Sequence, residues 1–355
     1  MSLENLRTKI DETDSSIVTL IAERMKIVQD IGKEKKAQGK QIEDTARETK
    51  VFEHVRDIAR KNNLSQDAIE GIYRQIISMS KNLQGTAVAF QGERGAYSED
   101  AALRFFGPSI QVKPCKRLDD VFKMVEQEKV QCGIVPIENS LEGSISLTYD
   151  LLLDSSLKVR GEMELRVVHC LIASMETSLG KIKKVYSHPQ ALGQCQAFLK
   201  HLNCEIIPAY DTAGSVKMIK ESGITDGAAI ASARAAEIYG MQILAQQIED
   251  NPNNFTRFFI LGKEDSPPSG NDKTSIVFSV KHTPGALYQF LKELADNKIN
   301  LTKIESRPTR QKAWDYNFYL DFEGHRDDKA PRKVLEYLNN SSIFVKVLGS
   351  YPRAN

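Results

Sequence analysis

The sequence is poor in cysteine, carries almost no net charge and has no long apolar run. Its five cysteines are odd in number and form no Cys-x-x-Cys pair, which argues against a disulfide framework or structural zinc and favours a reducing compartment. Residues 1–5 have no apolar signal core, and no stretch of 18 apolar residues follows; we therefore expect no membrane span and a cytoplasmic protein. A net charge of +1 gives no general reason to expect nucleic acid as a partner.

What the sequence does contain is an ordinary globular composition, with 41% hydrophobic and 27% charged residues over 355 positions. This length predicts two or three domains. Three patterns follow one another: helical periodicity over residues 1–85, alternating short strands and helices over 86–262, and, after a Pro/Gly/Ser-rich linker, a third pattern over 274–355. We take these as the expected domain boundaries.

The first pattern is that of a long helix with one apolar face. Apolar residues recur every three or four positions, namely Leu3, Leu6, Ile10, Ile17, Leu20, Ile27 and Ile31. A helix to about residue 37 is about 50 Å long, too long to be covered by so short a segment. We therefore expect an intertwined dimer or a long coiled coil. Two more helices are expected over about 43–61 and 65–83.

Charged and polar residues share the apolar faces of these three helices. Arg24 and Lys35 fall on the same side as Ile10 and Ile17, and burial of an unpaired cation costs several kcal/mol, so both call for an anionic partner. Arg7 points about 80–100° away from that face, towards a neighbouring site. The other members are Asp44, Arg47, Glu48, Ser80 and Gln84. Any one of these residues is explained more simply as a long side chain whose apolar stem covers its own helix. That explanation does not account well for the whole set.

This polar set resembles that of the all-helical chorismate mutases over residues 3–84. The matching motifs are Leu6-Arg7-x-x-Ile10, Ala22-Glu23-Arg24, Gly32-Lys33-Glu34-Lys35, Asp44-x-x-Arg47-Glu48 and Ser80-x-x-x-Gln84. The resemblance implies a dimer of three-helix protomers in which Arg7 enters the partner's site. Arg7 and Arg24 would then bind the two carboxylates of chorismate, and Lys35 and Gln84 the breaking ether oxygen. Asp44 and Glu48 would bind the ring hydroxyl of chorismate, and Ser80 would help to bind one of its carboxylates.

In the middle block, two polar clusters follow predicted strands and a third opens one, and such strand ends are where open α/β sheets bind ligands. The clusters contain Glu138 and Asn139, Ser187 with a following Gln194, and Thr256 with Arg257. A glycine-containing loop over residues 92–98 also leads from a strand into a helix. For the last cluster, the alternative is a core strand whose threonine is there for its β-propensity.

These clusters resemble the prephenate dehydratases over about 86–262. The motifs are Gly92-x-x-Gly95-x-Tyr97-Ser98, Val135-Pro-Ile-Glu-Asn139, Ser187-His-Pro-Gln190 and Asn254-x-Thr256-Arg257-Phe258. The resemblance implies two α/β lobes hinged as in periplasmic binding proteins, with the strand at 254–261 returning to the first lobe.

The implied reaction removes water and carbon dioxide from prephenate. Thr256 is then the essential hydroxyl, Arg257 and the 92–98 loop hold carboxylates, and Glu138, Asn139, Ser187 and Gln194 orient the ring. Whether Thr256 gives up its proton or only a hydrogen bond stays open.

The last block reads strand, helix, strand, strand, helix, strand, which is typical of a ferredoxin-like fold. It resembles the ACT domain of the same dehydratases in Pro284-Gly285-Ala286-Leu287 and Glu305-Ser306-Arg307-Pro308. The resemblance implies that phenylalanine binds between paired domains and closes the catalytic cleft. Tyr288 stands where an aliphatic residue is more usual, which leaves the choice of ligand open.

Together these patterns predict a multidomain protein: an all-α chorismate mutase domain, a two-lobed α/β dehydratase domain and an α+β ACT domain. The resemblance implies a bifunctional enzyme of phenylalanine biosynthesis that converts chorismate to prephenate and then to phenylpyruvate, under feedback by phenylalanine. We expect no metal or cofactor, and a homodimer or higher homo-oligomer. One alternative is a sensor that has lost its chemistry; another is dehydration of arogenate in place of prephenate.

Overall fold

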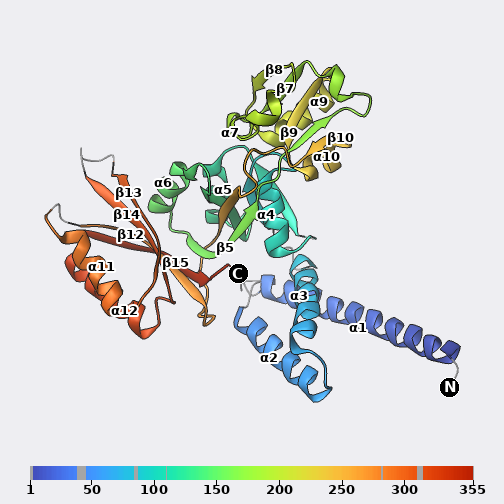
Figure 1. Ribbon diagram of the computed structural model, residues 1–355. Helices are drawn as coiled ribbons and strands as arrows, with labels where there is room; N and C mark the ends of the chain where they lie inside the picture. The colour runs from blue at the N-terminus through green and yellow to red at the C-terminus, as the bar shows by residue number, and fades with distance from the viewer. Residues whose placement is uncertain are drawn as a thin grey trace. The chain divides into compact units, whose positions relative to one another are not determined.

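The computed structural model describes residues 3–37, 45–83, 87–108, 110–280, 283–309 and 315–354. The chain divides into two compact units, one formed by Met1–Ala87 with Leu103–Gln111 and the other by Val88–Ala102 with Val112–Asn355. Figure 1 shows both units and labels many of their elements. Among the described residues, no helix has the length and apolar character needed to span a membrane.

The first unit contains the three expected helices, α1 (Leu3–Ala37), α2 (Thr45–Lys61) and α3 (Gln66–Leu83). Helix α3 packs against α2 and α1, and their small core contains Met25, Val28, Val55, Ile76 and Ile77. The N-terminal half of α1 contributes little to that core, because its apolar side chains are exposed in the single chain.

The second unit begins with the sheet of the first lobe. Its strand order is β2-β1-β3-β11-β5, with the two-residue strand β4 beside β3. The bounds are β1 (Ala87–Gln91), β2 (Gln111–Cys115), β3 (Cys132–Asn139), β4 (Gly143–Ser144), β5 (Lys158–Arg166) and β11 (Phe255–Gly262). Strand β11 runs antiparallel to both of its neighbours, so the expected return of this strand to the first lobe is confirmed. The helices of this lobe are α4 (Tyr97–Phe106), α5 (Leu118–Glu126) and α6 (Ser146–Asp154).

The second lobe is built on a sheet of order β10-β6-β9-β7-β8. Its strands are β6 (Cys170–Ala173), β7 (Lys184–Ser187), β8 (Glu205–Pro208), β9 (Gly227–Ala231) and β10 (Gln242–Gln246). Its helices are η1 (Leu179–Lys181), α7 (Pro189–Gly193), α8 (Gln196–Leu199), α9 (Thr212–Glu221) and α10 (Ala233–Tyr239). The chain crosses between the lobes twice, over residues 167–169 and 247–254, as the hinged two-lobed fold requires.

The C-terminal sheet has the order β13-β14-β12-β15 with every pair antiparallel, the ferredoxin-like arrangement. The elements are β12 (Asp272–Ser279), α11 (Ala286–Asp296), β13 (Leu301–Pro308), β14 (Tyr316–Glu323), α12 (Lys329–Ser341) and β15 (Phe344–Pro352). An apolar core containing Phe278, Phe290, Phe322 and Val334 joins the helices to one face. The other face is polar and approaches the first lobe through β15 and β5. A side chain at Gly349 would clash with the backbone of Val159.

Candidate active sites and the contacts around them

Two adjacent strands, β3 and β11, sort the candidate residues of the dehydratase lobes onto two faces. In their register, Thr256 lies opposite Asn139, and Arg257 lies opposite Glu138. Successive residues of a strand point to opposite sides of the sheet. The pair of Asn139 and Thr256 therefore belongs to one face, and the pair of Glu138 and Arg257 to the other.

On the first face, the Asn139 side chain is held in a defined orientation. Its Oδ1 accepts hydrogen bonds from the backbone N–H groups of Leu141 (3.0 Å) and Glu142 (3.1 Å), so its Nδ2 is the donor. That nitrogen lies 3.1 Å from Thr256 Oγ1 and 2.8 Å from Asn254 Oδ1. Thr256 itself is half-buried, and Asn139 holds its hydroxyl oxygen.

The hydrogen bonds continue from Asn254 across both lobes. Asn254 Nδ2 donates to Gln194 Oε1 (2.8 Å), and His169 Nε2 lies 3.0 Å from the same oxygen. His169 Nδ1 lies 2.9 Å from the Tyr97 hydroxyl. Burial lowers the pKa of His169, which favours the neutral ring. His169 was not predicted from the sequence, although a histidine inside the apolar run 167–173 is a signal that could have identified it.

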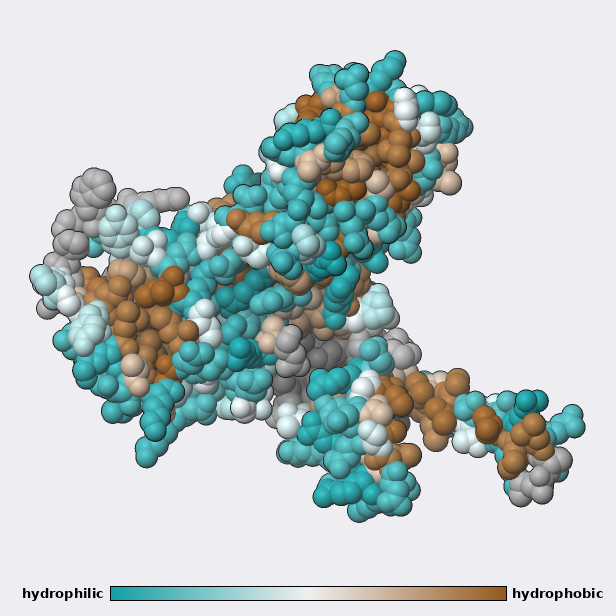
Figure 2. Space-filling model, viewed as in Figure 1, coloured by the Kyte–Doolittle hydropathy of each residue, from teal (hydrophilic) through white to brown (hydrophobic). Residues whose placement is uncertain are grey.

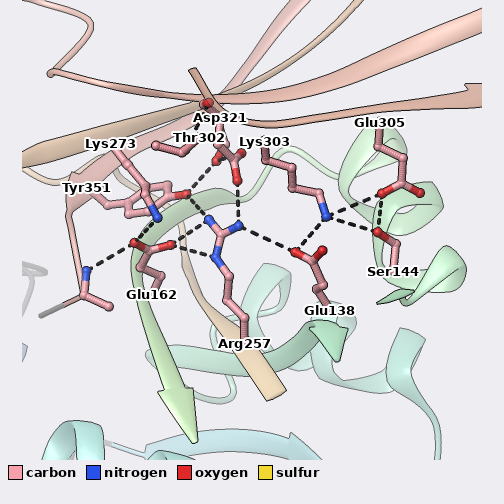
Figure 3. A network of polar contacts seen from close by, with 12 residues as sticks. Glu138, Ser144, Glu162, Arg257, Lys273, Thr302, Lys303, Glu305, Asp321 and Tyr351 are labelled. Atoms are coloured by element: carbon pink, nitrogen blue, oxygen red, sulfur yellow. Dashed lines mark hydrogen bonds and ion pairs between the residues drawn. The ribbon is translucent and has the colours of Figure 1, made fainter. Parts of the chain in front are cut away.

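On the opposite face, Arg257 and Glu138 contact the C-terminal domain (Figure 3). The Arg257 guanidinium pairs with Glu162 (2.8 Å from Nε) and Asp321 (2.7 Å from Nη1), and Glu138 pairs with Lys303 at 2.7 Å. The expected contact of these two residues with substrate stays a prediction. Strand alternation places both of them on the face opposite Asn139 and Thr256.

The other expected substrate contacts take different positions. Ser187 is buried and donates to the carbonyl of Ile230 at 2.6 Å. The 92–98 loop contacts the second lobe, where Lys217 Nζ pairs with Glu93 at 3.1 Å and the Ser232 hydroxyl donates to the Gly95 carbonyl at 2.7 Å. The carboxylate-binding role of this loop stays a prediction, and so does the role of Ser187.

In the helical unit, the structure brings together two of the predicted residues. Arg24 Nη1 on α1 donates to Ser80 Oγ on α3, and the Ser80 hydroxyl donates to the Ile76 carbonyl at 2.8 Å. Arg7 is exposed. The other four predicted residues or their side chains lie outside the described residues: Lys35, Asp44, Glu48 and Gln84. Their roles stay predictions.

The two predicted regulatory motifs lie in different surroundings. A pocket of about 400 Å³ at the start of α11 is lined by Val280, Thr283, Pro284, Ala286, Leu287, Asp315, Tyr316 and Phe318. Gly285 precedes the helix with φ of 84°, a conformation that favours glycine. The pocket thus includes Ala286 and Leu287 of the first motif.

The second motif, on strand β13, contacts the first lobe. Glu305 accepts from Ser144, and Arg307 donates to Ser146 (2.7 Å) and Asp150 (3.2 Å). The alternate residues of this strand, Ser306 and Pro308, are exposed. Over the described part of the chain, no three His, Cys, Asp or Glu side chains are placed to hold a metal ion.

Comparisons with known proteins agree with this architecture. Family models match in order along the chain: chorismate mutase type II at residues 6–85, prephenate dehydratase at 88–266 and the ACT domain at 274–340. The chain is 41% identical over 359 residues to a bifunctional chorismate mutase/prephenate dehydratase of Aquifex aeolicus, covering 99% of this chain and 98% of that protein.

Two further comparisons cover the second unit. The chain is 43% identical over 289 residues to the chloroplastic arogenate dehydratase/prephenate dehydratase 2 of Arabidopsis thaliana, covering 78% of this chain and 76% of that protein. It is also similar to a crystal structure of the prephenate dehydratase of Arthrobacter aurescens in complex with L-Phe. That similarity has a TM-score of 0.70 and 30% identity and covers 76% of this chain and 90% of that one.

Proposed function

The chain belongs to the family of bifunctional chorismate mutases/prephenate dehydratases, and from this premise we propose how its two activities are carried out and regulated. The family assignment brings both enzymatic activities, so a sensor without chemistry is no longer a competing interpretation. The proposed sequence is chorismate to prephenate to phenylpyruvate, as a part of phenylalanine biosynthesis in the cytoplasm.

The dehydration step is assigned to Thr256. In this reaction, the ring carboxylate leaves as carbon dioxide, its bonding electrons enter the ring, and the C–O bond to the ring hydroxyl breaks so that the oxygen leaves as water with one added proton. The observation that carries the assignment is the 3.1 Å contact from Asn139 to Thr256 Oγ1. Since this oxygen accepts from Asn139, the hydroxyl proton is free to be donated to the departing oxygen.

The polar environment favours hydrogen bonding over proton delivery. Asn139 and Asn254, which link Thr256 to the rest of the chain of hydrogen bonds, carry amides that do not titrate. Thr256 therefore lowers the barrier by stabilising charge on the leaving oxygen, a role for which preorganised donors contribute about 10²- to 10³-fold.

Replacement of Thr256 by valine tests this assignment. Thr256→Val keeps the shape of the side chain and removes the hydroxyl, so prephenate dehydration falls by about 10²- to 10³-fold. Chorismate mutase activity, measured on the same preparation, stays within twofold of the starting protein. Dehydration at the original rate would overturn the assignment, and a parallel loss of both activities would show that the two sites are not independent.

The mutase site is assigned to Arg24 and Ser80 together with Lys35, Asp44, Glu48 and Gln84, and with Arg7 of a second copy. Its pericyclic reaction needs no nucleophile, only a dianion held in its compact conformation. Support for the second copy comes from the apolar side chains along α1 (Figure 2), where Leu6, Ile10 and Ile17 are 46%, 59% and 49% exposed in the single chain. A homodimer covers this face.

Phenylalanine is assigned to the pocket at the start of α11, whose size and apolar lining suit a small amino acid. The L-Phe complex of the Arthrobacter aurescens relative supports this ligand. Strand β14 connects the pocket to the first lobe. Its Tyr316 and Phe318 line the pocket, while Asp321 pairs with Arg257 at 2.7 Å. Arg257 directly follows Thr256 in β11. A shift of β14 on phenylalanine binding therefore moves Arg257 and, through it, Thr256.

The choice between prephenate and arogenate is a separate question, raised by the double name of the Arabidopsis relative. The two substrates differ at the side chain, where prephenate carries a keto group and arogenate an amine. Comparison of kcat/KM for the two measures the preference. We propose prephenate, because the Aquifex aeolicus relative, which matches the whole chain, is named for it.

A further inference from the structure

A continuous series of polar side chains leads from the buried Tyr97–His169 pair to Thr256. Its members lie on both crossovers between the lobes: His169 follows β5, and Asn254 precedes β11. Both are almost fully buried, with exposed fractions of 2% and 0%. A buried amide and a buried imidazole need hydrogen-bond partners. The partners of Asn254 and His169 belong to the same series.

The proton positions follow from the acceptors. Asn139 Oδ1 accepts from two backbone N–H groups, so Nδ2 donates to Asn254 Oδ1. Asn254 must then donate from its own Nδ2, which it does to Gln194 Oε1 at 2.8 Å. That oxygen has no proton to give to His169 Nε2, 3.0 Å away, so the imidazole carries its proton on Nε2. With a neutral ring, Nδ1 is an acceptor, and the single proton of the Tyr97 hydroxyl lies between this nitrogen (2.9 Å) and the Val168 carbonyl (2.8 Å).

The directions of the hydrogen bonds in the series decide which atom of Asn139 faces Thr256. Asn139 cannot rotate its amide without losing its backbone donors and Asn254. Asn254 cannot rotate without facing Gln194 Oε1 with its own oxygen. As a result, Asn139 presents Nδ2 and not Oδ1 to Thr256 Oγ1, although this nitrogen shares its two protons with Asn254 Oδ1 and the Phe255 carbonyl. Facing a donor, the Thr256 hydroxyl directs its own proton elsewhere.

We propose that His169 and Asn254 are positioning residues of the dehydratase, which act through Gln194 and Asn139 to keep Thr256 a hydrogen-bond donor towards the leaving hydroxyl of the substrate. This inference rests on the proposed role of Thr256. It adds that the two crossovers, and not only the strand ends, belong to the dehydratase machinery. Gln194 lies on the second lobe and Thr256 on the first. The hydrogen bonds that orient Asn139 towards Thr256 therefore all form only when the two lobes hold the positions seen in this structure.

The test compares variants that cut the series with one that preserves it. His169→Leu removes the donor to Gln194, and Asn254→Ala removes the link between Gln194 and Asn139. In His169→Gln, the amide nitrogen takes the place of Nε2 and still donates. We expect kcat for prephenate to fall by about 10- to 100-fold in the first two variants, with KM within about threefold, since only the orientation of the reacting group changes. His169→Gln keeps kcat within about threefold of the starting protein.

Three controls make the outcome specific. The exposed His201, changed to leucine and to glutamine, leaves kcat unchanged in both cases. Chorismate mutase activity in each preparation reports on folding. The double variant His169→Leu with Asn254→Ala is no slower than the slower single variant, because both cut the same series.

The proposal is overturned if His169→Gln loses as much activity as His169→Leu, which indicates a packing role, or if KM rises while kcat is kept, which indicates direct substrate contact. Additive losses in the double variant also overturn it. Failure of the proposed function looks different: Thr256→Val then dehydrates prephenate at the original rate, whatever the effect of the His169 variants.

Discussion

The dehydratase lobes and the helical unit differ in how much of a site one chain assembles. In the lobes, Asn139, Gln194, Asn254 and Thr256 come from both lobes and one crossover and meet within hydrogen-bond distance. In the helical unit, Arg24 and Ser80 meet, but Arg7 lies exposed. Under our proposal, the dehydratase residues meet in the folded chain, whereas the mutase residues meet only in a dimer.

The difference follows from how each region buries its apolar surface. The lobes have large sheets covered by helices, and their strands β1, β3 and β9 are almost entirely buried. Three helices cannot bury a face about 50 Å long, and the apolar side chains along α1 are exposed in the single chain. We infer that the mutase site depends on association and that the dehydratase residues around Thr256 do not.

Arg24→Ala is expected to have the largest effect on one activity while leaving the other unchanged. The change removes a cation assigned to a substrate carboxylate and leaves Ser80 without its donor. We expect mutase kcat/KM to fall by about 10²- to 10³-fold, while prephenate dehydration in the same sample is unchanged. A loss of less than about fivefold would place Arg24 outside the site.

A smaller effect is expected where the dehydratase lobes meet the C-terminal domain. Lys303→Met removes the 2.7 Å ion pair with Glu138 and weakens the link between the two sheets. We expect about tenfold more phenylalanine to be needed for half-inhibition, with dehydration in the absence of phenylalanine within about threefold.

Calorimetry shows whether phenylalanine still binds to the Lys303→Met protein, which separates lost coupling from a lost ligand site. The matched control is Lys292→Met, because Lys292 is an exposed lysine of the same domain that pairs with Asp296 at 2.5 Å. Equal inhibition of the Lys303→Met protein and the starting protein would contradict the proposed route through this interface.

The smallest effect concerns the stability of the helical unit. Glu70 is buried between Arg56 and Arg74, each at 2.5 Å, and the hydrogen bond from Arg56 lowers the pKa of the carboxyl. A lowered pKa stabilises the fold above the unfolded pKa of about 4.3 and loses this contribution as the pH falls through the lower folded pKa.

Glu70→Gln should therefore destabilise the unit by about 1–3 kcal/mol at pH 7, and by progressively less as the pH falls below 4. Urea denaturation followed by circular dichroism at both pH values measures the difference. A destabilisation that does not change with pH would show that the ionised carboxylate is not the cause.

Much of the fold was predictable because apolar periodicity reports burial directly. The three helices and the order of the C-terminal elements follow from it, whereas the return of β11 was expected from the resemblance to the prephenate dehydratases. Strand β5 was not predicted, because Arg160, Glu162 and Glu164 interrupt its apolar pattern. Glu162 is nevertheless only 4% exposed, since Arg257 and Lys273 neutralise it. Ion pairs between domains cannot be read from one segment.

The candidate site was predictable only in part, because contacts between distant segments also determine it. Thr256 and Asn139 were placed at the ends of strands, where the structure has them. Arg257 was grouped with Thr256 because the two are adjacent in the sequence, although strand alternation places adjacent side chains on opposite faces. His169 was missed because its partners Tyr97 and Gln194 lie 72 and 25 positions away.

The most direct test of the central claim, that one activity needs two chains and the other needs one, is a complementation experiment. Arg7→Ala and Arg24→Ala proteins, each inactive as a mutase, are mixed in equal amounts and allowed to exchange subunits. If Arg7 serves the partner's site, half of the dimers are mixed and each has one intact site, so about a quarter of the original mutase activity returns, while dehydration is constant throughout. No recovery after demonstrated subunit exchange would show that each chain builds its own mutase site and would contradict the account.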